Sequence, residues 1–474
     1  MSLKKRYIAN VLLVTLFMMS ACSTLTHSPV KSGNALQQLQ VSTNGRFLQY
    51  QDGQPFFWLA DTAWLLFQKL SREEAERYLD DRKDKGFNVI QVMVIHDLPA
   101  VNFYGDYAFN GEGFTEPKVS KGHSFTDEEQ YDYWDHVDYI ADLAAKKGLY
   151  LAMVPAWGTI AKKQPQEGEW AAQYADWLGQ RFAHRINIIW LNGGDIYGNE
   201  IPQVWEKMGT ALDKHADQQL ITFHPRGRTQ SSTWFHNSDW LDFNMFQSGH
   251  RRYDQIGTDD PATWKGEDNW RYINEDYARL PIKPSIDGEP SYENIPRGLH
   301  DPKEGYWNDA DTRRYAYWSV FAGAFGHTFG NNAVMQMHKP NSGDGAFGVR
   351  NYWYEGMHEP GAGQMQYLKN LMLSRPYFER VPAQNLIAGA NGDEYNYLVA
   401  TRGQNYAFIY TYTGRSFDID GSKINAKFVT ASWYNPQNGE TSPALKMKNH
   451  AVLHFDPPGE EQAANDWVLI LDFK

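Results

Sequence analysis

The sequence is poor in cysteine: Cys22 is the only one among 474 residues. A chain with one cysteine cannot form an internal disulfide. A cysteine-bound iron–sulfur cluster is excluded on the same ground, and a catalytic thiol is excluded because Cys22 directly follows the predicted N-terminal signal segment. Hydrophobic residues make up 42% of the chain, which is enough for a large globular core without covalent cross-links.

Sequence fingerprints of cofactor and metal binding are also missing. No G-x-G-x-x-G follows a first strand and no G-x-x-x-x-G-K-[ST] occurs, so we expect no nucleotide cofactor. The 15 histidines include neither H-x-H nor H-E-x-x-H, which argues against a metal-dependent barrel hydrolase. Lys and Arg number 45 against 57 Asp and Glu, with no basic block, so nucleic acid is not an expected partner. We predict neither a cofactor nor a metal site.

A long transmembrane run is absent too, and the apolar segment that exists lies at the N-terminus. Basic residues at 4–6 precede an apolar stretch at 8–19, which is shorter than the ~20 residues that span a bilayer. Small residues then precede Cys22, and the segment resembles the signal of bacterial lipoproteins, in which this cysteine is lipidated. We predict a signal peptide at 1–21 and a polar tether at 22–37, with an ordinary secretory signal as the alternative.

A lipidated Cys22 would place the protein in the bacterial cell envelope. The lipid would be its only membrane contact, on the periplasmic or the surface face of the outer membrane. Loss of the signal would take the net charge from -12 to -15, because the segment carries three basic residues and no acidic one.

Aromatic residues, by contrast, are abundant. They reach 15% of the chain, with 17 Trp and 28 Tyr, which is more than a core of this size needs. Flat amphipathic rings suit the faces of sugars. We therefore expect some of them to line a sugar-binding cleft.

Eight apolar runs alternate with amphipathic helical stretches from residue 56 onward. They are FFWL at 56–59, NVIQVMVI at 88–95, LYLAMVPAWG at 149–158, INIIWLNGG at 186–194, LITFHP at 220–225, FNMFQ at 243–247, PSIDGE at 284–289 and HTFG at 327–330. Alternating apolar strands and helices predict a parallel sheet covered on both faces. Eight units fit a closed (β/α)8 TIM barrel better than an open doubly wound sheet, and we assign it to residues 38–380.

Local signals mark the boundaries of the elements. Asn44-Gly45 and Asp52-Gly53 predict hairpin turns before the barrel. The capping boxes Ser71-x-x-Glu74 and Thr126-x-x-Glu129 predict two helix starts. Short alternating strands fill residues 381–474, which predicts an all-β sandwich domain after the α/β barrel.

The predicted strand ends carry two prominent carboxylates. Asp195 follows the fourth strand and Glu289 follows the seventh. In such a barrel the chemistry lies at the carboxyl ends of the strands, where these two ends can face each other across a substrate. A carboxyl pair of this kind performs glycoside hydrolysis. The alternative is structural: Asp195 caps the next helix and Glu289 pairs with an arginine.

Four stretches then carry a resemblance to a known family. FFWLADTAW, INIIWLNGGD, PSIDGEPSYE and WSVFAGAFGHTFGNN look like glycoside hydrolase family 140, the apiosidases of pectin degradation. Those proteins also carry a C-terminal β domain often labelled collagen-binding. The resemblance implies Asp195 as acid/base and Glu289 as nucleophile. It also implies cleavage of the bond between apiose and galacturonic acid in rhamnogalacturonan II.

Catalysis at these strand ends sets further expectations. Asp195 must have a raised pKa, and an ionised Glu289 across the cleft is one way to raise it. We expect a retaining mechanism, with the two carboxyls about 5 to 5.5 Å apart. Eight other residues at strand ends are candidate substrate contacts: Asp61, Trp64, Trp157, Asn192, His224, Arg226, Gln247 and His250.

Basic residues gather after the fifth and sixth strands, although the protein is acidic. His224, Arg226, Arg228 and the run His250-Arg251-Arg252 can hold the carboxylate of a galacturonate. The alternative is that they pair with acids of the following loop, at positions 254, 259 and 260.

The expected partner is a polysaccharide or oligosaccharide. Two other possibilities stay open. One is a glycosidase with another plant-polysaccharide specificity on the same barrel. The other is a non-catalytic glycan-binding lipoprotein.

Overall fold

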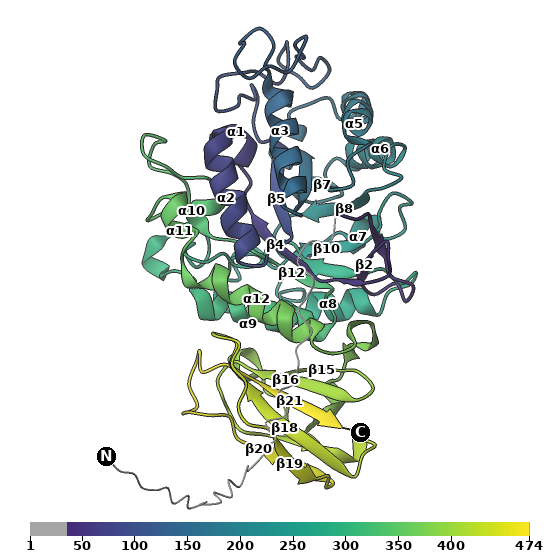
Figure 1. Ribbon diagram of the computed structural model, residues 1–474, viewed down its shortest axis with the longest axis vertical. Helices are drawn as coiled ribbons and strands as arrows, with labels where there is room; N and C mark the ends of the chain where they lie inside the picture. The colour runs from purple at the N-terminus through teal and green to yellow at the C-terminus, as the bar shows by residue number, and fades with distance from the viewer. Residues whose placement is uncertain (1–35, 474) are drawn as a thin grey trace, which may run out of the picture. The chain divides into compact units, whose positions relative to one another are not determined.

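The computed structural model describes residues 36–473 (Figure 1). The predicted signal peptide, Cys22 and nearly all of the predicted tether lie outside the described residues. Within the described part, no helix is both long and apolar enough to cross a membrane.

A small antiparallel sheet precedes the barrel. Its strands are β1 (Leu39–Val41), β2 (Leu48–Tyr50) and β3 (Pro55–Phe56). Gly45 and Gly53 take positive φ angles of 70° and 84° in its two turns, which confirms the predicted hairpins. Phe56, predicted as the start of the first barrel strand, pairs instead with Leu48 in this sheet.

Eight parallel strands form the barrel. One sheet has the order β12, β4, β5, β6, β7, β8, and β10 pairs with β11 in a second. Their bounds are Trp58–Thr62 (β4), Val89–Ile95 (β5), Tyr150–Ala156 (β6), Ile188–Ile196 (β7), Leu220–Pro225 (β8), Asn244–Gln247 (β10), Ser285–Asp287 (β11) and Gly326–Phe329 (β12). A short strand, β9 (Thr229–Gln230), pairs antiparallel with β10.

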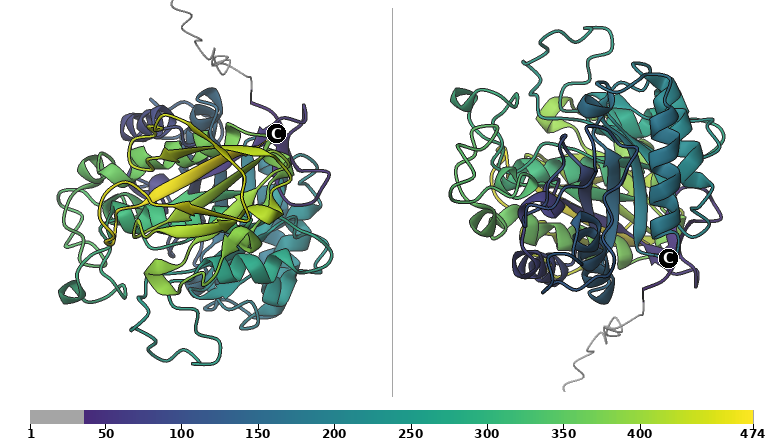
Figure 2. Two further views of the ribbon diagram at one scale, coloured as in Figure 1. Left: turned by 90° about the horizontal axis from the view of Figure 1, so that it is seen from below. Right: turned by 90° about the horizontal axis from the view of Figure 1, so that it is seen from above.

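Hydrogen bonds between the two sheets close the ring. The amide of Asp242, just before β10, donates to the carbonyl of Ile221 in β8 at 2.9 Å. The amide of Phe325, just before β12, donates to the carbonyl of Ser285 in β11 at 3.2 Å. The predicted (β/α)8 barrel is thereby confirmed, and helices surround its strands (Figure 2).

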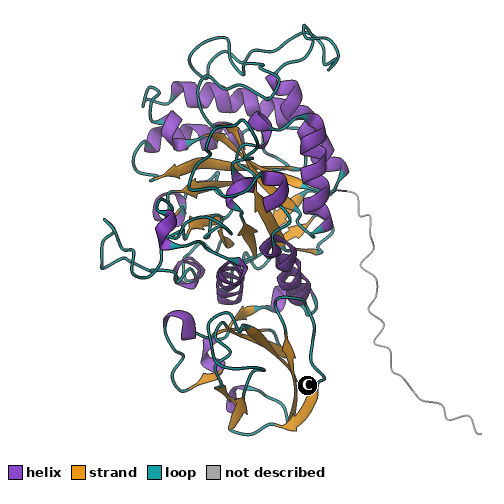
Figure 3. Cartoon of the chain, turned by 90° about the vertical axis from the view of Figure 1, so that its left-hand side faces the viewer, coloured by secondary structure: helices purple, strands orange, loops and turns teal. Residues whose placement is uncertain are grey.

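The longer helices cover the outside of the barrel (Figure 3). They are α2 (Arg72–Asp84), α3 (Tyr133–Lys146), α5 (Glu169–Phe182), α6 (Pro202–Asp213), α8 (Trp270–Tyr277), α9 (Asp309–Ala322) and α12 (Pro360–Leu373). One-turn helices are α1 (Leu66–Lys69), α4 (Gly158–Ala161), α7 (Ser232–Phe235), α10 (Asn332–Met335) and α11 (Trp353–Gly356). The capping box of Ser71 and Glu74 opens α2 as predicted.

The predicted start of the next helix is wrong. No helix begins at Thr126, and α3 begins at Tyr133 after the N-cap Asp132. The Asp132 carboxylate accepts from the amides of Trp134 and Asp135 at 2.7 and 3.0 Å. The reason is that the buried stripe starts only at Tyr133, so a cap directly before it gains packing that a cap at Thr126 would not.

The C-terminal region is a sandwich of two antiparallel sheets around its own core. The larger sheet contains β13 (Val381–Pro382), β15 (Val399–Arg402), β16 (Tyr406–Thr411), β21 (Trp467–Phe473), β18 (Phe428–Tyr434) and β19 (Leu445–Lys448). The smaller contains β14 (Ile387–Ala388), β17 (Phe417–Asp420) and β20 (Val452–Phe455). Helix α9 of the barrel packs against β15 and β16.

Candidate active site

A pocket of about 610 Å³ opens at the carboxyl ends of the barrel strands. Residues at or just after seven of the eight strands line it, from Trp64 after β4 to Glu289 after β11. After β12, helix α10 and the loop behind it complete the wall. Of the predicted site residues, Trp64, Trp157, Asp195, Arg226, Gln247, His250 and Glu289 line this pocket.

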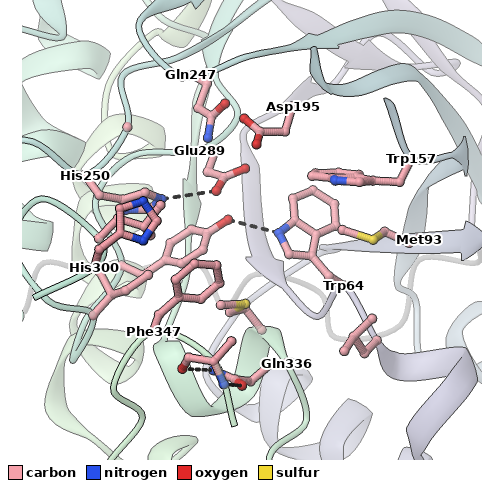
Figure 4. Close-up of a pocket in the computed structure, with 18 of the residues that line it drawn as sticks. Trp64, Met93, Trp157, Asp195, Gln247, His250, Glu289, His300, Gln336 and Phe347 are labelled. Atoms are coloured by element: carbon pink, nitrogen blue, oxygen red, sulfur yellow. Dashed lines mark hydrogen bonds and ion pairs between the residues drawn. The ribbon is translucent and has the colours of Figure 1, made fainter. Parts of the chain in front are cut away.

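Asp195 lies at an irregularity near the end of β7. The register with β8 shifts between Gly193 and Ile196, and Asp195 has a positive φ of 47°. A Cβ on Gly193 would lie 2.7 Å from the carbonyl oxygen of His224, and one on Gly194 would lie 2.5 Å from the Trp157 ring. Only glycine fits at both positions, and the resulting bulge directs the Asp195 side chain into the pocket (Figure 4).

Glu289 follows β11 and lies between two histidines. Its Oε1 is 3.2 Å from Nε2 of His250, and its Oε2 is 3.3 Å from Nε2 of His224. Burial opposes ionisation of this carboxyl, but the two histidines outweigh it and lower its pKa to about 2. Glu289 is therefore ionised near neutral pH.

The pKa of Asp195 moves in the opposite direction. Burial is the largest cause of its increase, and the negative charge of Glu289 adds to it. The charges of Arg226 and His224 partly oppose this increase. One carboxyl of the pair is thus held ionised and the other is biased toward its protonated form, which is the division of roles that acid catalysis with a nucleophile requires.

Tyr292 is a pocket residue that the sequence reasoning did not identify. The indole N–H of Trp64 donates to its hydroxyl at 3.2 Å. Burial and the charge of Glu289 raise the pKa of Tyr292 well above 10, so it stays a neutral phenol. The sequence feature that could have identified Tyr292 is its position three residues after Glu289 in the motif PSIDGEPSYE.

The aromatic wall of the pocket comes from the ends of β4 and β6. The rings of Trp64 and Trp157 lie 5.4 Å apart (Figure 4). Trp64 is almost fully buried, with 4% of its surface exposed, whereas Trp157 is half-buried. Trp157 is therefore the more accessible ring for a sugar face.

Three candidate substrate contacts do not line the pocket. Asp61 is fully buried outside the ring of strands, where its carboxylate accepts from Tyr78 at 2.6 Å and pairs with Arg82 at 3.2 Å. Asn192 donates to the carbonyl of Trp205 in α6 at 2.8 Å. Alternate residues of a strand face opposite sides, and both side chains fall on the helix side.

His224, the third, is fully buried but contacts Glu289 directly. It is placed to set the charge of that carboxylate rather than to contact a substrate.

The basic residues divide into two groups. Arg228 and Arg251 both pair with Asp259, and Arg252 pairs with Asp254 and Glu304. For these three the alternative, pairing mainly within the following loop, is correct. Arg226, Arg228 and Arg251 all line the pocket, but of these three Arg226 alone has, within residues 36–473, no acidic group within 4.0 Å.

Further lining residues come from segments that carried no sequence signal. Lys69 lies at the end of α1, and His96 follows β5. The loops after β11 and α10 contribute His300 and Phe347, whose rings lie 6.2 Å apart (Figure 4). Loop positions of this kind have no periodicity from which their contacts could be predicted. Within residues 36–473, no group of three or more His, Cys, Asp or Glu side chains is arranged to hold a metal ion.

Comparison with known proteins agrees with this geometry. Residues 42–379 match the family model described as "Apiosidase-like, catalytic domain", and residues 381–472 match "Putative collagen-binding domain of a collagenase". A solved structure described as a glycoside hydrolase is 46% identical, with a TM-score of 0.86, and the match covers 92% of this chain and 97% of that one.

A glycoside hydrolase family 5 structure from Bacteroides vulgatus is 44% identical, with a TM-score of 0.85 and coverage of 92% and 94%. No curated protein sequence matches the chain. The family model covers most of the chain and the barrel matches glycoside hydrolases over its full length. The chain therefore belongs to the apiosidase-like family and is a glycoside hydrolase.

Proposed function

We propose that the protein is a retaining glycosidase that cleaves the bond between apiose and galacturonic acid in rhamnogalacturonan II of plant pectin. One observation carries the catalytic part of this proposal. Asp195 and Glu289 lie in one pocket with pKa values displaced in opposite directions, Glu289 to about 2 and Asp195 upward.

In the first step, Glu289 attacks the anomeric carbon and the bond to the leaving oxygen breaks. Asp195 gives its proton to that oxygen, so the leaving sugar departs as a neutral alcohol. In the second step, Asp195 removes a proton from water, and the water oxygen displaces Glu289 from the glycosyl-enzyme. Tyr292 and the two histidines orient the Glu289 carboxylate through both steps.

The charge of the pocket favours an acidic leaving sugar. Arg226 lines it and has no acidic partner within 4.0 Å among the described residues. A guanidinium group binds a carboxylate through two parallel hydrogen bonds. Arg226 also weakens the increase in the pKa of Asp195, and both residues line the same pocket.

The decisive experiment compares the full-length protein, purified in detergent, with Glu289→Gln on rhamnogalacturonan II and a panel of neutral plant glycans. Products are identified by chromatography. The proposal predicts that the wild type releases an oligosaccharide ending in apiose and that the variant does not. Glu200→Gln is the control, because Glu200 lies outside the pocket and pairs with Lys162.

Other outcomes select the alternatives. Cleavage of a neutral glycan alone would support the glycosidase mechanism but contradict the proposed pectin substrate. No cleavage of any glycan would favour a non-catalytic binding protein. Proton NMR of the first-formed product tests retention, since an inverting enzyme would release the opposite anomer.

We also propose that Cys22 carries a lipid that anchors the enzyme in the bacterial cell envelope. The support is the sequence pattern of residues 4–22. Labelling with a palmitate analogue should mark the wild type and not Cys22→Ser, and the variant should leave the membrane fraction. Equal labelling of the two proteins would contradict an anchor at this residue.

A further inference from the structure

A long insertion between β5 and α3, residues 97–132, carries an unusual share of exposed apolar surface. It is the loop drawn in dark blue at the top of Figure 1. Five of the chain's exposed large hydrophobic side chains lie on it: Phe103, Tyr104, Tyr107, Val119 and Phe125. Phe103 and Tyr107 are the most exposed of the aromatic residues, at 45% and 48%.

Phe103 and Tyr107 belong to one tight turn, residues 101–107, which we call the aromatic turn. A β-bridge between Val101 and Tyr107 closes it. Inside it, the Asn102 side chain donates to the Asp106 carboxylate at 3.0 Å and accepts from the Asp106 amide at 3.0 Å. The turn is thus held by hydrogen bonds rather than by burial of its rings.

Tyr104 attaches the aromatic turn to the barrel. Its hydroxyl accepts from the amide of Arg72, at the start of α2, at 2.9 Å. Its ring packs edge-on against Phe125, 5.2 Å away, and against Phe103, also 5.2 Å away. Phe103 is therefore supported from behind while nearly half of its surface stays open to solvent.

One lysine connects Phe103 with the pocket wall. Nζ of Lys339 lies 4.4 Å from the centre of the Phe103 ring. The same Nζ donates to the backbone carbonyl of Lys69 at 2.7 Å, and Lys69 lines the pocket. The loop that carries Lys339 also supplies Ser342 and Phe347 to the pocket wall. The aromatic turn is thus linked to the pocket wall through the Lys339 side chain.

This junction has an excess of positive charge. Lys339 pairs with Glu74 at 2.9 Å, whereas Lys69 has no acidic partner within 4.0 Å among residues 36–473. Partial burial and the neighbouring charge of Lys339 both lower the pKa of Lys69. A ligand carboxylate between the two lysines would relieve their repulsion.

We propose that the aromatic turn, together with Lys69 and Lys339, is a second sugar-binding site for acidic residues of the glycan that lie away from the bond cleaved. The exposed rings bind the apolar faces of sugars, and the lysines bind uronate carboxylates. This inference rests on the proposed function, because it assigns to the same pocket a substrate longer than the two sugars at the cleavage point.

The kinetic test uses two substrates of different length. Phe103→Ala and Tyr107→Ala are compared with the wild type on rhamnogalacturonan II oligosaccharide and on 4-nitrophenyl apioside, which occupies the pocket alone. The kcat/KM for the oligosaccharide should fall about tenfold for Phe103→Ala, the typical loss when one aromatic anchor is truncated. The kcat/KM for the nitrophenyl glycoside should stay unchanged.

Val119→Ala is the matched control, since Val119 lies on the same insertion and is 49% exposed. It should leave both substrates unaffected. Equal losses on both substrates for Phe103→Ala would overturn the proposal, because they would report a disturbed pocket. No loss on either would overturn it as well.

A binding test separates this proposal from the proposed function. Glu289→Gln, which cannot turn over a substrate, is run through native gels containing polygalacturonate or neutral galactomannan. Retardation by polygalacturonate alone, abolished by adding Phe103→Ala, supports the second site even if the wild type cleaves another linkage. Equal retardation by both polymers, or by neither, contradicts it.

Discussion

Two regions of this protein bury several charges, and they use them differently. At the contact between barrel and sandwich, Arg314 lies between Asp311 and Glu267, and Tyr395 of the C-terminal region donates to Glu267 at 2.8 Å. In the pocket, Asp195 and Glu289 are two acids in one cavity, and among residues 36–473 the basic side chains that pair with them within 4.0 Å are the two histidines at Glu289.

The two regions differ in which charged groups meet: acids meet arginines at the interface, whereas two acids share the pocket. Arg313 of α9 forms a two-pronged pair with Asp466, at 2.9 and 2.8 Å, and both side chains are almost fully buried. Such matched pairs hold two structural units in one orientation. In the pocket two carboxyls share one cavity and their pKa values are displaced in opposite directions, which is how active sites obtain an acid and a nucleophile from the same functional group. A buried ion pair therefore joins the C-terminal region to α9 of the barrel.

The largest expected effect falls on the pocket. Glu289→Gln should lower kcat by about 10⁴-fold or more, because it removes the nucleophile. Its melting temperature should fall only modestly, since the amide keeps the shape of the side chain but loses the charge that the two histidines stabilise. Steady-state kinetics and calorimetry measure the two quantities. A large loss of stability with the loss of activity would contradict the separation of roles between the two regions.

At the interface the opposite pattern is expected. Asp466→Asn leaves the buried Arg313 charge with Asp309 as its one acidic partner among the described residues, and should lower the free energy of unfolding by about 3 kcal/mol. Asp472→Asn is the matched control, because Asp472 forms a similar two-pronged pair with Arg375 that is partly exposed. Its cost should be about 0–1 kcal/mol. Urea denaturation measures both, and equal costs would mean that burial of the first pair does not matter.

A smaller effect is expected at Tyr292. Tyr292→Phe removes the acceptor of the Trp64 indole and a hydroxyl beside Glu289, and kcat should fall about tenfold. Tyr317→Phe is the control, since Tyr317 is equally buried but packs against Tyr410 of the sandwich. An unchanged kcat in Tyr292→Phe would contradict the role of Tyr292 in orienting the Glu289 carboxylate.

The smallest effect is a shift of the pH profile. Activity requires Asp195 protonated, so kcat/KM should fall on the alkaline side as this group loses its proton. Arg226 lowers the pKa of Asp195, and Arg226→Met should therefore move the alkaline limb to higher pH, by less than about one unit.

Arg252→Met should leave that limb in place, because Arg252 pairs with Asp254 outside the pocket. A shift to lower pH in Arg226→Met would contradict the assignment of Asp195 as the acid. The alkaline limb is measured from the pH dependence of kcat/KM on the nitrophenyl glycoside. This substrate contains no uronate, so loss of carboxylate binding by Arg226 does not affect the result.

Much of the fold could be predicted because its signals are local. Each barrel strand is a short apolar run between helix signals, and the glycines of the Gly193-Gly194-Asp195 motif mark the bulge that exposes the acid. The error at Thr126 shows the limit of such signals. A capping box is common in sequence, and only the buried stripe that begins at Tyr133 decides which one starts the helix.

The sequence by itself determined the barrel, the sandwich and the presence of Asp195 and Glu289 at strand ends. Only the tertiary structure decided that Asp61 and Asn192 face the helices, that His224 and His250 enclose Glu289, and that Lys69 and Tyr292 join the pocket. The physical reason is the separation along the chain of the residues that determine each feature. Strand and helix periodicity is set by neighbours in the chain, whereas pocket contacts and displaced pKa values depend on residues that meet only when the ring of strands closes.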